Sequence, residues 1–93
     1  MNSRYEVIFL PEAEEDLENL DPSIRKRCLR KIEWLSLHPE VLGKKPLQNL
    51  PLALKGLNSY TVGGWRILYW VYPAQKCIKI YGIQHRSSVY KNL

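Results

Sequence analysis

The chain of 93 residues is long enough for one domain, 1–93, and too short for a second hydrophobic core. Apolar residues make up 45% and charged residues 25% of it, which excludes intrinsic disorder, and no apolar run approaches the roughly 20 residues that span a bilayer. All nine carboxylates lie between Glu6 and Glu40, so the first forty residues carry a net charge of −3 and the remainder, with eight Lys or Arg, carries +8. A basic half of this kind indicates nucleic acid as a partner, and a merely solvated basic face is the alternative.

The first forty residues predict a strand followed by two helices. Alternating apolar residues over 4–10 are typical of a strand. A proline followed by four acidic residues predicts a short helix over 11–20. A second helix is expected from Asp21, as N-cap, to about Leu37, because the residue before Pro39 is disfavoured in the α region. The two helices should form an antiparallel pair.

The remaining residues predict a β-meander. After a loop over 40–51, we expect strands over 52–62, 65–72 and 77–84, with turns at 63–64 and 73–76. Sequential strands with short connections pair as antiparallel neighbours, and the first strand of the chain should join their sheet. The predicted fold class is therefore α+β, with the helix pair packed on one face of the sheet.

No familiar catalytic motif is present in the sequence. The remaining residues able to carry chemistry lie near the ends of the last two predicted strands. The candidate catalytic residues are Arg66, His85, Arg86 and Tyr90, and the candidate substrate-binding residues are Lys55, Lys44 and Lys45. These residue types suit RNA scission, in which a 2′-hydroxyl attacks the neighbouring phosphorus without a metal. Arginine binds phosphate oxygens through its planar fork, and histidine or a perturbed tyrosine can transfer protons.

Each candidate also has a structural interpretation. Arg66 lies within an apolar strand, where it either meets an acidic residue of the helical half or waits for a ligand. A histidine at a strand end, such as His85, is often only a surface residue. His38 is expected to be structural, at the end of a helix, and the aromatic residues of strand 65–72 are expected to lie in the core.

Metals, disulfides and membranes are not expected. The half after Glu40 lacks the clustered carboxylates of a metal-dependent nuclease, so neither a metal nor another cofactor is predicted. Cys28 and Cys77 form no CxxC pair and are expected to be buried thiols. The N-terminus has no signal-peptide pattern, and we therefore expect a cytoplasmic protein.

Two motifs at a specific spacing carry a resemblance to a known family. They are G-x-W-R-I-L-Y over 63–69 and H-R-x-x-V-Y over 85–90, and weaker similarities extend the match over residues 4–90. In these features the chain resembles the RelE/ParE superfamily of toxins from type II toxin–antitoxin modules. The resemblance implies a RelE-like, microbial RNase-like fold.

For the RelE branch, the resemblance implies cleavage of mRNA in the ribosomal A site, inhibition of translation and growth arrest. It also implies a cognate antitoxin that covers the basic groove, with operator DNA contacted only through that antitoxin. By position, Arg66 matches an arginine that binds phosphate and stabilises the transition state, and Arg86 falls in a basic cluster. Tyr90 matches a tyrosine that stacks on a base or assists proton transfer, whereas His85 matches a histidine of less certain role.

Some positions depart from this pattern. Ribosome-cleaving relatives often carry basic residues where this chain has Ser59 and Thr61, and one relative has a basic residue at Gln84. Because Arg66, Arg86 and Tyr90 are retained, the first hypothesis is a ribosome-dependent, metal-independent mRNA endoribonuclease. The alternatives are a ParE-like, non-enzymatic inhibitor of DNA gyrase and a degenerate member that acts only as a DNA-binding co-repressor with its antitoxin.

Overall fold

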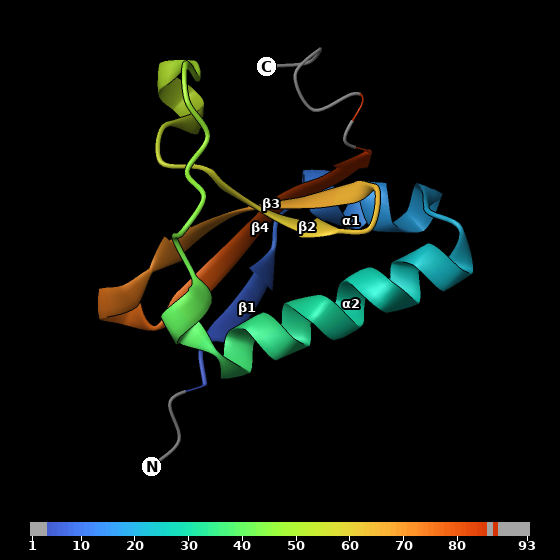
Figure 1. Ribbon diagram of the computed structural model, residues 1–93, viewed down its shortest axis with the longest axis horizontal. Coiled ribbons are helices and arrows are strands. Elements are labelled where there is room, and N and C mark those ends of the chain that lie inside the picture. Colours follow the sequence, from blue (N-terminus) through green and yellow to red (C-terminus); the bar gives the residue numbers. More distant parts are fainter. Residues whose placement is uncertain (1–3, 86, 88–93) are drawn as a thin grey trace.

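The computed structural model describes residues 4–85 and residue 87, and its fold is α+β in two layers (Figure 1). The helices and strands are, in chain order, β1 (Glu6–Phe9), α1 (Pro11–Asn19), α2 (Pro22–Leu37), β2 (Asn58–Val62), β3 (Trp65–Tyr72) and β4 (Cys77–His85). Three short 3-10 helices lie at Pro39–Val41, Leu52–Leu54 and Pro73–Gln75. Within the described residues, no helix is long and apolar enough to cross a membrane.

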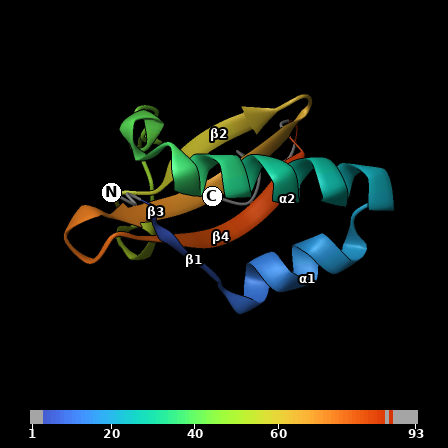
Figure 2. The same cartoon turned by 90° about the horizontal axis from the view of Figure 1, so that it is seen from below.

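The strands form one sheet in the order β1-β4-β3-β2. β2, β3 and β4 pair antiparallel as consecutive neighbours, which confirms the predicted meander. β1 joins the sheet at the edge away from β2 and runs parallel to β4, with Glu6 opposite Cys77 and Phe9 opposite Ile80. Figure 2 shows α1 and α2 running in opposite directions along the sheet, as predicted for an antiparallel helix pair.

The main hydrophobic core lies between the helix pair and one face of the sheet. Its buried members are Ala13, Leu20, Cys28, Ile32, Ile67, Tyr69, Ile78, Ile80 and Ile83. Alternate residues of β3 point to the other face, where Leu57 and Leu68 form a smaller cluster with Trp70 and Tyr81 around them. The helices therefore cover one face only, and part of the opposite face remains available. Both cysteines are buried free thiols, as expected.

A guanidinium joins the two helices. Arg25, in the second turn of α2, donates from Nε to the carbonyl of Leu17 at 2.7 Å and from Nη2 to the carbonyl of Leu20 at 3.1 Å. A third contact, to the carbonyl of Glu18, is 3.3 Å long. Arg25 thus adds a charged donor to carbonyl groups at the end of α1, of which that of Leu17 also accepts the Leu20 N–H at 3.2 Å.

The strand expected over 52–62 is wrong in its first half. Leu52–Leu54 is a 3-10 helix, and β2 begins only at Asn58. Gly56 has φ of +88°, a left-handed conformation that breaks an extended strand, and the indole of Trp70 donates to the carbonyl of Lys55 at 3.0 Å. Of the apolar side chains in this segment, Leu57 is buried against Leu68 of β3, whereas Leu52 is 85% exposed.

Candidate active site

Arg66, the second residue of β3, lies on the sheet face that the helices do not cover. The strand register places Thr61 of β2 on one side of it and Gln84 of β4 on the other. Its Nε and the Gln84 Oε1 are both buried, and neither has a hydrogen-bond partner among the described residues. The only ion pair between described residues joins Arg4 to Glu33 at 3.9 Å, so within this part of the chain Arg66 meets no acidic residue. Of its two predicted environments, an ion pair with an acidic residue of the helical half is not found among the described residues, and ligand binding by Arg66 stays a prediction.

His85 lies on the opposite face of the sheet from Arg66. It is paired in register with Trp65, and the two rings meet edge to face with centroids 5.2 Å apart. Its Nδ1 lies 2.9 Å from the Ser87 hydroxyl. Because neighbouring residues of a strand point to opposite faces, the histidine that follows Gln84 is turned away from the Arg66 side. The structure thus brings His85 to the correct end of the sheet but not to the same face.

The other two candidate catalytic residues, Arg86 and Tyr90, lie outside the described residues. Their roles therefore rest on the sequence resemblance alone.

The lysines proposed for substrate binding are divided between two places. Lys44 and Lys45 line a pocket of about 350 Å³ at the outer edge of β2, together with Ser59 and Thr61. The Ser59 N–H donates to the Lys45 carbonyl at 3.1 Å, which fixes this lysine pair along the strand edge. Thr61 is paired in register with Arg66 on the neighbouring strand β3, so this pocket lies beside the arginine.

Lys55 occupies a different position on the same face. Its carbonyl accepts the Trp70 indole N–H, four residues along β3 from Arg66. With Leu50 and Leu52 it lines a separate pocket of about 360 Å³. Lys55 is therefore near the candidate site without being part of the Arg66 group.

The end of β4 is held by α1 and not by β1. β1 pairs with β4 only as far as Ile80, after which Tyr81 is the extra residue of a β-bulge. Beyond the bulge, the Asp16 carboxylate of α1 accepts the Ile83 N–H at 2.9 Å. A Cβ atom on Gly82 would lie only 2.9 Å from the same carboxylate oxygen, so glycine is required there for this contact. Asp16 thus holds the strand that leads directly into the candidate catalytic residues.

Burial raises the pKa of the Asp16 carboxyl above its ordinary value. The hydrogen bond from the Ile83 N–H acts in the opposite direction, and the nearby charges of Glu15 and Glu12 add to the increase. The ionised carboxylate therefore accepts the Ile83 N–H although its partial burial disfavours the charged form.

Sequence reasoning missed how the charge divides between the two helices. α1 holds five carboxylates and no cation, whereas α2 holds five Lys or Arg and one glutamate. Counting charge by halves of the chain concealed this, because the five acids of α1 and the five cations of α2 cancel in the sum. The signal was present in the sequence as two oppositely charged runs separated by Asp21-Pro22.

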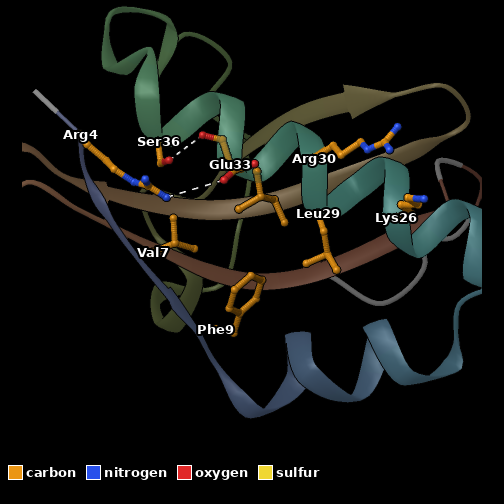
Figure 3. A pocket seen from close by; sticks show the side chains of 9 residues that line it. Arg4, Val7, Phe9, Lys26, Leu29, Arg30, Glu33 and Ser36 are labelled. Atoms are coloured by element: carbon orange, nitrogen blue, oxygen red, sulfur yellow. Dashed lines mark hydrogen bonds and ion pairs between the residues drawn. The ribbon is translucent and has the colours of Figure 1, made fainter.

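A groove of about 500 Å³ lies between β1 and α2 (Figure 3). Its floor is apolar, and Lys26, Arg30 and Arg4 are the cations around it. Figure 3 shows that Arg4 reaches toward Glu33, the single acidic residue of α2. The groove lies on the helix side of the sheet and is separate from the Arg66 face. Among the described residues, no group of three or more His, Cys, Asp or Glu side chains is arranged to hold a metal ion.

Comparisons with known protein families and solved structures show which proteins this chain is similar to. The profile of the ParE toxin of the type II toxin–antitoxin system, parDE, matches residues 7–90. A solved structure of the toxin–antitoxin complex RelBE2 from Mycobacterium tuberculosis is similar at 30% identity and a TM-score of 0.76, over 90% of this chain and 93% of that chain. No curated protein sequence matches significantly.

More distant structures share the fold. A mutant of the E. coli toxin RelE in the free state is 16% identical with a TM-score of 0.73, over 94% of this chain and 88% of that one. The chromosomal ParDE system from P. aeruginosa is 14% identical with a TM-score of 0.66, over 89% and 97% of the two chains.

Proposed function

Because the chain belongs to the RelE/ParE superfamily of toxins from type II toxin–antitoxin modules, we propose that it is a metal-independent endoribonuclease that cleaves mRNA on the ribosome. The observation that carries this proposal is the Arg66 guanidinium, whose buried Nε is without a partner among the described residues. A cation held in this way on an open sheet face suits an anionic ligand such as a phosphodiester.

The proposed reaction uses the 2′-hydroxyl of the mRNA itself. This hydroxyl loses its proton and attacks the adjacent phosphorus, the bond to the 5′-oxygen breaks, and that oxygen takes up a proton. The products end in a 2′,3′-cyclic phosphate and a 5′-hydroxyl. Arg66 stabilises the added negative charge on the phosphoryl oxygens, an effect typically worth about 10²–10³ in rate for one donor.

The remaining roles are assigned as follows. Arg86 supplies a second cation, and Tyr90 positions a base or transfers a proton. His85, on the helix face beside Trp65, packs the strand end and takes no part in the chemistry. The hydroxyls of Ser59 and Thr61 replace the basic residues of other members, and the Lys44–Lys45 pocket beside them compensates with charge.

The proposed partners are the ribosome, its mRNA and a cognate antitoxin, all in the cytoplasm. Toxin–antitoxin complexes named RelB–RelE from Methanococcus jannaschii and RelE–RelB from Pyrococcus horikoshii have folds similar to this chain. Binding of an acidic antitoxin segment would neutralise the basic surface, and contact with operator DNA would occur only through that antitoxin.

A second function is favoured by one observation, the match to the ParE family profile over residues 7–90. In that case the protein would bind DNA gyrase and cut no RNA. The absence of basic residues at Ser59 and Thr61 fits this alternative, whereas the buried Arg66 Nε, which has no partner within the described part of the chain, favours the nuclease.

The test is induced expression of the wild type, Arg66→Ala and, as a matched control, Arg30→Ala on the exposed surface of α2. The nuclease predicts mRNA 5′ ends in phase with codons for the wild type and the control, and their loss in Arg66→Ala with an unchanged circular dichroism spectrum. DNA breaks with intact mRNA would contradict it and identify the gyrase inhibitor. An unfolded Arg66→Ala protein would assign that residue a structural role.

A further inference from the structure

A row of side chains crosses the sheet face that the helices do not cover. Thr61 of β2 is paired in register with Arg66 of β3, and Arg66 is paired with Gln84 of β4. Residues directly opposite each other on antiparallel strands point to the same face, with Cβ atoms roughly 4.5–5.5 Å apart. Arg66 and Gln84 are therefore neighbours on this face, and both side chains are long enough to meet.

Each of these two neighbours has one buried polar atom without a hydrogen bond. The Arg66 Nε carries a donor and the Gln84 Oε1 is an acceptor, and neither has a partner within the described part of the chain. In that part, the Asn58 Oδ1 is the only other buried side-chain atom in this state. Each of the two neighbours thus offers the kind of group that the other lacks. Because unpaired buried groups reduce stability, their presence side by side in a folded protein calls for a functional explanation.

The geometry of the guanidinium group determines what a bond between these two atoms would do. Arginine carries N–H groups on Nε and on both terminal nitrogens, all in one plane. A phosphate is bound either side-on, by Nε and one terminal nitrogen, or end-on, by both terminal nitrogens. When the Gln84 Oε1 accepts the Nε–H, only the end-on arrangement remains and the plane of the guanidinium is fixed. Gln84 would thus determine how Arg66 presents its charge.

The surroundings of Gln84 favour a neutral acceptor at this position. Gln84 also lines a small pocket of about 190 Å³ with Glu12, Glu15 and Asp16 of α1, a pocket that Arg66 does not reach. An amide oxygen accepts a hydrogen bond without adding negative charge, so it orients the guanidinium and leaves its positive charge for a phosphate. A carboxylate in its place would orient Arg66 and also neutralise it.

We propose that Gln84 is a positioning residue for Arg66: when a phosphate binds, the Gln84 Oε1 accepts the Arg66 Nε–H and directs both terminal nitrogens toward the phosphoryl oxygens. The identity of this phosphate as the scissile group of mRNA rests on the proposed function. The negative charge on the phosphoryl oxygens increases in the transition state, so the orientation of Arg66 affects kcat more than it affects binding of the substrate.

The first test follows the Arg66 Nε–H by NMR spectroscopy of the full-length protein, with inorganic phosphate as the probe. Phosphate is expected to slow the exchange of this proton with solvent at least about tenfold in the wild type. Gln84→Met has a similar volume but no amide acceptor, so it should lose this protection. Gln84→Glu should show the protection already without phosphate, because a carboxylate accepts the same bond. Gln75→Met, at the exposed turn between β3 and β4, is the matched control and should behave as wild type.

The second test measures cleavage on ribosomes programmed with mRNA. Gln84→Met should reduce kcat by about 10–100-fold and leave KM nearly unchanged. Gln84→Glu should keep kcat within about threefold of wild type and increase KM, because its guanidinium is oriented but neutralised. A purely structural role would not separate kcat from KM in this way. Replacing an unpaired buried polar atom by an apolar one should leave the urea midpoint of Gln84→Met at or above that of wild type.

Several results would overturn the proposal. One is the absence of phosphate protection of the Arg66 Nε–H in the wild type, and another is equal protection in wild type and Gln84→Met. A lowered urea midpoint in Gln84→Met would assign Gln84 a structural role, and an unprotected Nε–H in Gln84→Glu would exclude the hydrogen bond. Failure of the proposed function looks different: protection by phosphate would still depend on Gln84, but neither wild type nor any Gln84 variant would cleave mRNA on ribosomes.

Discussion

Replacing Asp16 by alanine is expected to loosen the end of β4, because its carboxylate is the acceptor of the Ile83 N–H. Ile83 is only 3% exposed, so its amide gains little from water when the acceptor is removed. An unsatisfied buried N–H costs about 1–3 kcal/mol. Removal of a partly desolvated carboxylate offsets part of this cost, because its desolvation no longer opposes folding. We therefore expect the free energy of unfolding to decrease by about 1–2 kcal/mol. For a domain of this size, that loss corresponds to a decrease in Tm of about 4–16 °C.

The conservative variant Asp16→Asn separates the hydrogen bond from the charge. Asparagine keeps an acceptor for the Ile83 N–H and avoids the burial of a carboxylate. Because burial raises the pKa of Asp16 in the folded state, the contribution of Asp16 to stability is full below its unfolded pKa and is lost as pH rises through the folded pKa. The stability of Asp16→Asn relative to wild type should therefore increase as pH rises above the ordinary carboxyl pKa of about 4.

Hydrogen exchange of the Ile83 amide and urea unfolding measure the local and global effects, with Glu14→Ala on the exposed side of α1 as the control. Gly82→Ala should displace the Asp16 carboxylate, since its Cβ would lie 2.9 Å from Oδ2, and should therefore be non-additive with Asp16→Ala. Unchanged protection of Ile83 in Asp16→Ala would refute this reasoning, as would an Asp16→Asn variant as unstable as the alanine variant.

Two further predictions concern stability. Arg25→Gln should reduce the free energy of unfolding by about 1–2 kcal/mol, because carbonyls at the end of α1 lose a charged donor. The control Lys26→Gln should have almost no effect, and equal urea midpoints for the two variants would contradict this. Tyr69→Phe should cost about 0.5–1.5 kcal/mol at neutral pH through loss of the acceptor of the Gly43 N–H. Burial raises the pKa of Tyr69, so the wild-type protein should lose stability above about pH 10. The difference in free energy of unfolding between wild type and Tyr69→Phe should therefore become smaller there, and a difference that stays constant with pH would argue against this.

The helices were predictable because their starts carry strong local signals. Proline is compatible with the first turn of a helix, and both helices begin at a proline. Asp21 occupies the N-cap position as expected, although its side chain makes no capping hydrogen bond and instead accepts the Ser23 hydroxyl at 3.0 Å. The position of the helix start is thus set by backbone preference more than by the cap.

The segment 52–57 was misread because its apolar residues resemble a strand in isolation. Its conformation is decided by tertiary contacts, above all the hydrogen bond between Trp70 and the Lys55 carbonyl, and by the left-handed Gly56. Nothing local distinguishes such a segment from the start of β2.

Within the candidate site, sequence reasoning identified Arg66 but not the face on which each neighbour lies. A shift of one residue in strand register exchanges the two faces, so the separation of Arg66 from His85 depends on the pairing of Trp65 with His85. The Asp16–Ile83 contact joins residues far apart in the sequence and follows from a bulge that no local pattern predicts.

The most direct test of the central claim is cleavage by purified toxin on ribosomes programmed with mRNA that carries one 2′-deoxynucleotide at the scissile position. Proposed attack by the 2′-hydroxyl predicts a 2′,3′-cyclic phosphate on the all-RNA substrate and no cleavage at the deoxy position, with neighbouring steps unaffected. Arg66→Ala should reduce cleavage of the all-RNA substrate by about 10²–10³. Cleavage of the deoxy substrate at the wild-type rate would contradict the account.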